Sequence, residues 1–284
     1  MPLLAYSCYT ISMIVAIDTG GTKTLIAGYD TRGATSIKYK FETPKKTSEY
    51  IDTLTTHLTA LFGDKEVTAI SLAVPGPVKD GIVTHCPNLG WTNFPIVREL
   101  KGVLGNAPIY LENDANLAGL AEARSLRKIP RSCLYVTIST GIGSGIIIDG
   151  HIHEGLANSE AGHALIEYDG KVREWESFGS GQAVFKAYKK LGRDIKSKRT
   201  WRQIADRISR GFLAVIPTLQ PEVIVIGGSI GTHFKKYEED LNDILKKHLP
   251  AMIPLPKIVE AKHPEEAVIY GCYYHALDQL IAEA

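Results

Sequence analysis

The sequence predicts an α/β fold in two domains. Patterns typical of strands and helices alternate along the chain and do so twice, and a glycine-rich turn lies near the start of each half. The length agrees, because 284 residues, 44% of them hydrophobic, can bury two modest cores, and a chain of this length commonly divides. Two α/β lobes are therefore expected.

The first half is predicted to contain one sheet and one covering helix. Apolar runs rich in β-branched residues indicate strands at 13–17, 24–29, 37–41, 67–74 and 108–111. An amphipathic helix over 47–62, packed on that sheet, is predicted by apolar residues at helical spacing, namely Ile51, Leu54, Leu58 and Leu61.

The second half repeats the pattern. Strands are predicted at 133–139, 145–148 and 223–226. Two helices are indicated by apolar residues at helical spacing, the first by Ile204, Ile208, Phe212 and Val215, the second by Tyr237, Leu241, Leu245 and Leu249. Pro264 followed by two glutamates predicts a last helix that ends near Ala282.

Composition excludes several classes of protein. Lys and Arg number 32 against 31 Asp and Glu, which gives no global charge for nucleic acid or an anionic membrane. No apolar run approaches the roughly 20 residues of a membrane span, and residues 1–10 lack the pattern of a signal peptide. Residues 1–12 are interpreted as an extension. A reducing, cytoplasmic setting is expected because the cysteines are widely spaced, at Cys8, Cys86, Cys133 and Cys272.

Two glycine turns, each expected between two strands, suit phosphate. In the 18–23 turn (DTGGTK), two glycines let backbone N–H groups approach a phosphate, and Asp18 can bind Mg²⁺ directly or through water. The 139–145 turn (STGIGSG) opens the second half in the same way. One turn alone would indicate an ordinary hairpin, whereas two suggest a clamp on a nucleotide. Neither a dinucleotide fingerprint nor a Walker A sequence is present.

Two further segments carry candidate site residues. The 224–229 stretch (IVIGGS) ends a predicted strand and opens a helix, where adenine and ribose can lie against bare backbone; an ordinary turn is the alternative. The 112–118 stretch (ENDANLA) leaves a strand and enters a helix, so Asp114 is expected near a helix N-terminus. Taken alone, this segment indicates a helix cap at Asp114.

Together these segments resemble the ROK family of bacterial and archaeal sugar kinases. The motifs occur in the family's order and cover nearly the whole chain from Met13. They are DTGGTK at 18–23, PGP at 75–77, NL at 88–89, ENDAN at 112–116, STGIGSG at 139–145 and EAGH at 160–163.

The resemblance implies a two-lobed actin-like (ribonuclease H-like) ATPase fold with the active site in the interlobe cleft. It implies a first lobe of residues 13–114 plus 265–284, a second lobe of 115–264, and a homodimer through the second lobe. Asp114 matches the catalytic base. The positions matching sugar ligands are Asn88, Asn113, Asp114, Glu160, His163 and Glu176. The nucleotide and phosphate contacts expected from the turns are Asp18, Gly20, Gly21, Thr22, Lys23, Thr140, Gly141, Gly227 and Gly228.

The sequence departs from the family pattern in three places. Many members bind zinc through the histidine of the GH pair and three cysteines, but here residues 168–176 contain no cysteine, and one histidine with scattered carboxylates is a poor zinc site. No zinc is predicted. Ser159 replaces the glycine that usually precedes the motif's glutamate, which bears on loop shape and sugar preference. About 12 residues precede the first strand, too few for a helix-turn-helix repressor module.

The predicted activity is ATP-dependent phosphorylation of a hexose, with glucose converted to glucose 6-phosphate. N-acetylglucosamine, N-acetylmannosamine and fructose remain open as acceptors, and another nucleotide or polyphosphate as donor. The alternatives are a sugar sensor without turnover and an actin-like ATPase. A basic run between Lys186 and Arg202 indicates either a solvated face or a polyanion site. His151 and His153 indicate a hairpin exit rather than a metal pair, and Trp91 and Trp175 either core packing or sugar stacking.

Overall fold

The computed structural model describes residues 12–30 and 32–283, so the predicted extension lies outside the described residues apart from Ser12. The chain forms two compact units. Unit 1 comprises Met1–Leu117 with Val268–Ala284, and unit 2 comprises Ala118–Ala267. The divisions at 117 and 267 each lie three residues beyond the predicted lobe limits at 114 and 264.

Unit 1 is built on a five-stranded sheet in the order β3-β2-β1-β4-β8. β1 pairs antiparallel with β2, which pairs antiparallel with β3, whereas β4 runs parallel to β1 and β8 parallel to β4. All five strands match predicted runs, and their bounds are β1 Ile14–Thr19, β2 Lys23–Tyr29, β3 Thr35–Glu42, β4 Ala69–Val74 and β8 Ile109–Asn113.

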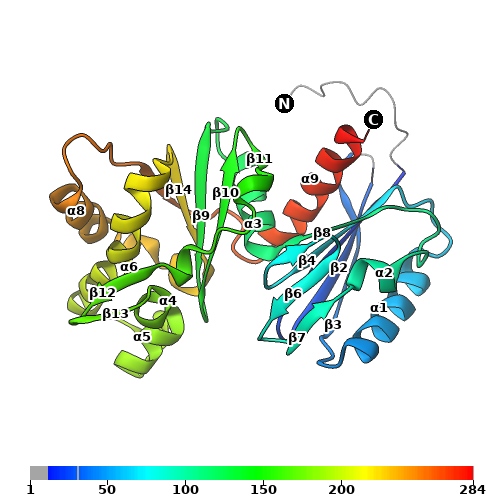
Figure 1. Ribbon diagram of the computed structural model, residues 1–284, viewed down its shortest axis with the longest axis horizontal. Helices are drawn as coiled ribbons and strands as arrows, with labels where there is room; N and C mark the ends of the chain where they lie inside the picture. The colour runs from blue at the N-terminus through cyan, green and yellow to red at the C-terminus, as the bar shows by residue number, and fades with distance from the viewer. Residues whose placement is uncertain (1–11, 31, 284) are drawn as a thin grey trace. The chain divides into compact units, whose positions relative to one another are not determined.

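Successive side chains along each strand point to opposite faces of the unit 1 sheet, and both faces are buried. Val15 and Ile17 belong to the core cluster that also contains Tyr50 and Leu54 of α1, Thr47–Phe62, which has the bounds that the sequence predicts. The opposite face receives α9, Ala267–Ala282, where Cys272 donates a hydrogen bond to the Ile17 carbonyl (Figure 1). Burial on both faces explains why the strands read as continuous apolar runs.

Unit 1 also contains a three-stranded sheet, which the sequence did not predict. Its strands are short, and Trp91 at its edge is 2% exposed, packs against the Tyr50 ring and donates to the Lys45 carbonyl at 2.8 Å. Trp91 is therefore a core residue rather than a sugar-stacking surface. The elements are β5 Val78–Lys79, β6 Ile82–Cys86 and β7 Trp91–Phe94, followed by α2 Ile96–Leu100.

Unit 2 is also built on a five-stranded sheet, in the order β11-β10-β9-β14-β15. Its strands are β9 Ser132–Ile138, β10 Ile142–Ile148, β11 His151–Ile152, β14 Val223–Gly227 and β15 Lys257–Glu260. β10 begins at Ile142, so the predicted 139–145 turn is shorter than expected, because residues 142–145 already pair with β9. His151 lies in the β10–β11 hairpin, as predicted.

One face of this sheet is covered by α6, Lys198–Leu219, and α8, Glu238–His248 (Figure 1). Leu134, Val136 and Ile138 of β9 share a core cluster with these helices and with Trp175, which is fully buried and packs on Phe212. Trp175 is therefore core as well. The remaining elements are α3 Asp114–Arg124, β12 Leu165–Tyr168, β13 Lys171–Glu174, α4 Glu176–Gly179, α5 Gly181–Tyr188 and α7 Gly228–Gly231. Four short 3-10 helices are Glu154–Leu156, Ala161–His163, Gly192–Asp194 and Phe234–Lys236.

Two further observations concern the described part of the chain. Cys86, Cys133 and Cys272 are buried and free. Over residues 12–30 and 32–283, none of the helices combines the length and the apolar composition needed to cross a bilayer.

Candidate functional site

The glycine turn of unit 1 is held against Asn88 by a lysine. Gly20 to Thr22 connect β1 and β2, and the Gly20 N–H donates to the Lys23 carbonyl at 2.9 Å. The Lys45 ammonium donates both to the Gly21 carbonyl and, at 2.9 Å, to the Asn88 carbonyl. A residue predicted to contact sugar thus lies beside a turn predicted to contact phosphate.

The turn leaves no room for a side chain at Gly20 and packs at an ordinary distance at Gly21. A Cβ on Gly21 would lie 3.5 Å from the Asn88 Cβ, and a Cβ on Gly20 would lie 2.9 Å from the Lys23 carbonyl oxygen. Thr22 and Lys23 are exposed, so their side chains are accessible to a ligand at the mouth of the turn. A side chain at 20 would move the turn, because its contact is with backbone, and backbone N–H groups would no longer be presented closely; the distance at 21 is an ordinary van der Waals contact.

Asp18 stands at the end of β1, beside this turn. Burial raises the pKa of its carboxyl to about 6, and Lys40 opposes the rise. Asp18 and Lys40 lie in one cross-strand row, since Asp18 pairs with Leu25 and Leu25 pairs with Lys40. A partly desolvated carboxylate next to a phosphate-facing turn is a fitting oxygen ligand for Mg²⁺, which commonly binds through one or two carboxylates and substrate phosphates.

The ENDAN segment places a carboxylate at the start of α3. The Asn113 side-chain oxygen accepts from the N–H groups of Ala115 at 2.8 Å and Asn116 at 3.2 Å, so Asn113 caps the helix. The expectation of a cap at Asp114, based on this segment alone, is therefore wrong by one residue. Asp114 is the first helical residue and is half-buried, and its carboxylate is stabilised by the partial positive charge of the helix end.

The neighbours of Asp114 explain the rest of the motif. Glu112 accepts from the Asn113 N–H at 2.7 Å and from the Asn116 side-chain amide at 2.9 Å. Asn113 also donates to the Gly76 carbonyl at 3.2 Å, which ties the helix start to the PGP turn. Because its side-chain oxygen already accepts two N–H groups in the cap, Asn113 can offer a sugar only the remaining N–H of its side-chain NH₂ group.

The buried Cys86 thiol is affected by one charge at the start of α3 and by another beside the glycine turn. Burial raises the pKa of Cys86, the Asp114 carboxylate adds to the rise, and Lys45 opposes it. Cys86 ends β6, two residues before Asn88.

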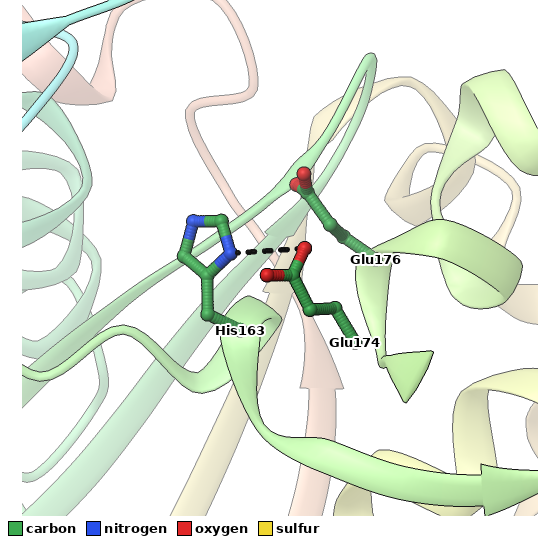
Figure 2. Close-up of side chains that lie close together, drawn as sticks. All are labelled: His163, Glu174 and Glu176. Atoms are coloured by element: carbon green, nitrogen blue, oxygen red, sulfur yellow. Dashed lines mark ion pairs between the residues drawn. The ribbon is translucent and has the colours of Figure 1, made fainter. Parts of the chain in front are cut away.

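Unit 2 collects the other predicted sugar residues. Figure 2 shows the His163 ring facing the carboxylates of Glu174 and Glu176, with the His163 Nδ1 lying 3.4 Å from Glu174 Oε2. One ligand atom from each lies within 4.8 Å of the others. Burial raises the pKa of Glu160, with His163 opposing and Glu176 adding to the rise, so Glu160 lies near the same group.

Backbone contacts hold this acidic cluster in place. Glu176 accepts the Ile142 N–H at 3.0 Å, and a Cβ on Gly141 would lie 2.4 Å from the same carboxylate oxygen. A side chain at 141 would therefore displace the Glu176 carboxylate from this position. Ser144 of β10 donates to the Ser159 carbonyl at 3.2 Å and accepts from the Ala161 N–H at 3.0 Å, which fixes the loop that carries Glu160.

The cluster corrects one premise of the zinc prediction. The carboxylates are not scattered, since those of Glu174 and Glu176 converge on His163. A structural zinc site commonly has four ligands, often with thiolates, whereas this cluster offers one imidazole and two carboxylates, one of them already accepting a backbone N–H. One imidazole and two carboxylates fit the hydroxyl groups of a sugar better than they fit a zinc ion.

A pocket of about 510 Å³ lies wholly within unit 2. One end is formed by Ser139 and Thr140 together with the N-terminus of α5, where Gly181 donates to the Ser139 carbonyl at 2.7 Å. The Ser229 N–H donates to the Ser139 hydroxyl at 3.2 Å, which joins the turns that follow β9 and β14. The other end is lined by Phe185, Leu191, Gly192, Arg193, Ile230, Thr232 and His233.

The two ends of the pocket differ chemically. The first presents hydroxyls and a helix N-terminus, which suit phosphate. The second presents apolar side chains, and Phe185 and Leu191 are each 44% exposed, which leaves apolar surface for a flat ring to cover. The pocket therefore matches a nucleoside phosphate.

Gly227 and Gly228 have no room for a side chain. A Cβ on Gly227 would lie 2.4 Å from the Tyr135 hydroxyl, and one on Gly228, whose φ is +79°, would lie 2.6 Å from the Ile138 carbonyl oxygen. Both positions therefore need glycine for packing and conformation. The pocket itself is lined by the next two residues, Ser229 and Ile230.

Sequence reasoning missed several residues of these sites. Lys45 and Ser144 each make two hydrogen bonds to backbone groups that are distant in the chain, for which a sequence has no signal. Glu174 lies two residues before Glu176, so a search around the predicted residue finds it. Phe185 precedes the basic run and Leu191 lies within it. Each is next to a lysine, a pattern typical of exposed segments.

The comparisons with known proteins identify the family of this chain. The model of the ROK family matches residues 14–279. A fructokinase from Pediococcus pentosaceus is 30% identical over 77% of this chain and 80% of its own. An N-acetylmannosamine kinase from Salmonella paratyphi A is 30% identical over 76% of this chain and 83% of its own.

A solved structure shows the same fold. The crystal structure of the ROK hexokinase from Thermus thermophilus is 26% identical, with a TM-score of 0.76 over 95% of this chain and 99% of that one. The predicted actin-like α/β fold is thereby confirmed. Because the family match spans nearly the whole described chain and both relatives share about three-quarters of it, this chain belongs to the ROK family.

Proposed function

We propose that this protein is an ATP-dependent sugar kinase that phosphorylates a hexose hydroxyl, with Asp114 as the general base. One observation carries the proposal: Lys45 joins the glycine turn expected to hold phosphate to Asn88, expected to hold sugar. The proposed donor and acceptor positions are therefore neighbours in unit 1. Relatives named as fructokinase and N-acetylmannosamine kinase support this activity class.

The chemistry assigns a separate task to each group. Asp114 orients the attacking hydroxyl and accepts its proton as the bond to phosphorus forms, which a carboxylate can do because the proton leaves late. Asp18 is the side chain that would hold Mg²⁺, which supplies neutralisation of charge on the phosphate oxygens when bound. The Gly20–Gly21 turn presents backbone N–H groups to the same phosphates.

The nucleoside is proposed to lie in the pocket of unit 2. Thr140 and the start of α5 contact phosphate, and Phe185 and Leu191 contact the base. The proposed sugar ligands are Asn88, Asn113, Asp114, Glu160, His163 and Glu176. A sugar offers hydroxyls that both donate and accept, and each one left buried and unpaired costs about 1 to 3 kcal/mol, so these polar groups set specificity.

Glucose is the proposed acceptor, and a panel of sugars tests it. ADP formation would be measured with MgATP and glucose, fructose, N-acetylglucosamine or N-acetylmannosamine, each against a no-sugar control. Sugar-dependent ADP release, highest with glucose, is expected. A higher rate with another sugar would replace glucose as the substrate, whereas ADP release without sugar, or sugar binding without any ADP, would contradict the kinase assignment.

Replacing Lys45 with methionine is expected to weaken both substrates. Lys45→Met removes a charge-assisted bond to Gly21 and another to Asn88, so KM for MgATP and for sugar should each rise about tenfold, with a smaller change in kcat. Lys46→Met is the matched control, because Lys46 is exposed and its ion pair with exposed Glu49 contributes little. Equal kinetics of the two variants, measured by initial rates, would refute the role of Lys45.

Asp18 is expected to cost stability in its charged form. Its pKa of about 6 in the folded protein exceeds the unfolded value of 3.8, so the folded state binds more protons between these values and stability falls as pH rises through this window. Asp18→Asn should therefore raise the free energy of unfolding by about 1 to 2 kcal/mol at pH 8, after allowance for partial exposure, and by much less near pH 4.

Urea unfolding without Mg²⁺ at both pH values measures this effect. Asp52→Asn, on the exposed side of α1, serves as the control and should leave stability unchanged at each pH. A stability difference for Asp18→Asn that does not depend on pH would show that the carboxyl is not destabilised by burial. The variant should also bind MgATP more weakly, which would make Asp18 a site where function is retained at the expense of stability.

We further propose a homodimer formed through unit 2. Leu165 and Val172 are 72% and 69% exposed and lie on one face of the β12–β13 hairpin, where a second copy would cover them. Light scattering of the purified protein is expected to give the mass of two chains. A mass of one chain at micromolar concentration would contradict the proposal.

A further inference from the structure

We propose that a pocket of unit 1, away from the proposed catalytic groups, binds a small organic monoanion, namely a carboxylate on a compact apolar body, and that this binding strengthens sugar binding. We call it the α2 pocket. It has a volume of about 670 Å³ and is formed by the β5–β6 turn, α2 and the loop between α2 and β8. All of its lining residues belong to unit 1. Binding of the anion is independent of the proposed function, whereas its effect on sugar rests on it.

The α2 pocket has the size and the lining of a small-molecule site. Its volume falls in the range of about 300 to 1,000 Å³ that is typical of such sites. A Cβ at Gly102 or at Gly105 would meet nothing within 4 Å, so the loop leaves open space beside the pocket. The apolar lining residues are Ile82, Pro95, Val97, Ala107, Pro108 and Ile109. An apolar ligand body would cover these side chains and remove their surface from water.

The charged lining residues favour a ligand with one negative charge. Arg98 and Lys101 carry two positive charges and Asp80 carries one negative charge, so the lining has a net charge of +1 from 2 − 1. Within the described part of the chain, Lys101 forms no ion pair, whereas Arg98 pairs with the neighbouring Glu99 at 3.0 Å. A carboxylate matches the single excess charge, and a phosphate monoester, which approaches two negative charges at neutral pH, exceeds it.

The α2 pocket lies at the starts of two strands that lead to the proposed catalytic groups. Ile82 is the first residue of β6, which ends at Cys86, two residues before Asn88. Ile109 is the first residue of β8, and Asp114 follows the last residue of that strand. Five strand residues span about 16 Å, so the pocket is separate from the catalytic groups but shares two rigid elements with them.

A series of contacts also connects the α2 pocket with a residue expected to hold sugar. Pro95 lines the pocket, and the Phe94 ring before it packs on Trp91, with the ring centroids 5.1 Å apart. Trp91 donates to the Lys45 carbonyl at 2.8 Å, and the Lys45 ammonium donates to the Asn88 carbonyl at 2.9 Å. Because closely packed groups move together, a change in the position of α2 would reach Asn88 through these contacts.

The ligand would join wall segments that are only weakly held to one another. The Val97 N–H donates to the Gly81 carbonyl at 3.3 Å, which is long for a hydrogen bond of this kind. The 101–106 loop consists of turns, with Gly102 at φ 85° and Gly105 at φ 68°. A ligand in contact with all three segments would hold the starts of β6 and β8 in one arrangement. Sugar binding at the other ends would then order less of the chain and become stronger.

Three probes test what the α2 pocket recognises. Phenylacetate combines a carboxylate with an apolar body, phenethyl alcohol keeps the body without the charge, and acetate keeps the charge without the body. Ligand-observed NMR of the full chain is expected to give a Kd of about 1 mM for phenylacetate, which is usual for a ligand of this size. Phenethyl alcohol and acetate should each bind at least about fivefold more weakly, because each lacks one of the two matched features.

Two double variants test the charge of the lining. Arg98→Gln/Lys101→Gln removes both cations of the α2 pocket, and Lys65→Gln/Lys79→Gln removes two cations of unit 1 outside it and is the matched control. All four residues are exposed, so neither variant is expected to unfold the protein. The first variant should bind phenylacetate about tenfold more weakly and phenethyl alcohol within about twofold of the parent. The control should match the parent with both probes.

Hydrogen exchange measured by mass spectrometry locates the bound probe. Phenylacetate is expected to slow exchange in residues 80–82 and 97–109 of the parent, because these segments carry most of the lining. Acetate at the same concentration is the control and should leave exchange in both segments unchanged. This comparison separates ligand binding from an effect of ionic strength.

The effect on sugar is measured as a change in affinity, without ATP. Titration calorimetry uses glucose, or the sugar that gives the highest rate in the panel, in saturating phenylacetate and in acetate of equal concentration. The Kd for sugar is expected to be about fivefold lower in phenylacetate, which is the lower end of the usual coupling between two sites. The Kd for phenylacetate should fall by the same factor when sugar is present, because coupling is reciprocal.

The contrary results can be told apart. Failure of phenylacetate to bind, or slowed exchange only in other segments, would overturn the site. Equal affinities for phenylacetate and phenethyl alcohol, or equal losses in the two double variants, would overturn the choice of a carboxylate. Binding at the α2 pocket with an unchanged or raised Kd for sugar would overturn the coupling. A protein that binds phenylacetate there but binds no sugar would contradict the proposed function and leave the site standing.

Discussion

Asp114→Asn is expected to lower kcat about 10² to 10⁴-fold while sugar binding persists. The carboxylate stands at the first position of α3, and the substitution keeps its size while removing its ability to accept the hydroxyl proton. The helix itself should remain, because its cap is Asn113 and not Asp114. Initial rates of ADP release and calorimetric titration with sugar measure the two properties separately.

A conservative substitution in the same unit provides the control. Asp80→Asn changes an exposed aspartate at φ 50°, a conformation that asparagine also adopts readily, and should leave both kcat and binding unchanged. If Asp114→Asn retains the parent kcat, the assignment of the base is wrong. Loss of sugar binding together with the loss of rate would make Asp114 a binding residue instead.

Gly271→Ala is expected to destabilise unit 1 by about 1 to 3 kcal/mol. A Cβ at this position would lie 1.9 Å from the Leu117 carbonyl oxygen and 2.4 Å from its carbonyl carbon, and backbone cannot rotate away as a side chain does. α9 must therefore shift relative to the end of unit 1 at Leu117. Because Leu117 follows Asp114 by three residues in α3, the shift should also lower kcat.

Urea unfolding followed by circular dichroism measures this loss, with rates measured on the same samples. Ile281→Ala, at a position of α9 that is 57% exposed, is the control and should change stability by no more than about 0.5 kcal/mol. An unchanged unfolding midpoint for Gly271→Ala would mean that the helices accommodate a methyl group at their contact, and that this glycine is not needed for packing.

Much of the fold was predictable from local patterns. α1 has the bounds that its apolar spacing predicts, and the five strands of the unit 1 sheet match five apolar runs, because residues buried on both faces leave a strong signal. β5, β6, β7, β12, β13 and β15 were missed. They have two to five residues each, and their stability comes from contacts such as the packing of Trp91 on Tyr50, which no local pattern records.

The candidate site divides in the same way. The glycine turns and the ENDAN segment are continuous stretches, so their residue types indicate their chemistry without knowledge of the fold. The contributions of Lys45, Ser144 and Glu174 arise from neighbours that are close in space. Lys45, for example, reaches Asn88 across 43 positions of the chain, and a lysine that donates to two carbonyls has the same local sequence as an exposed one.

By itself, the sequence determined that this protein is an α/β member of a sugar-kinase-like family with an acid at a helix start, because strands, helices and glycine turns depend on neighbours within a few residues. Only the tertiary structure decided that Asn113 is the cap, that Trp91 and Trp175 are core, and that Gly227 and Gly228 serve packing. Those outcomes depend on which distant atoms fill the space around each residue, and such distances are properties of the folded chain.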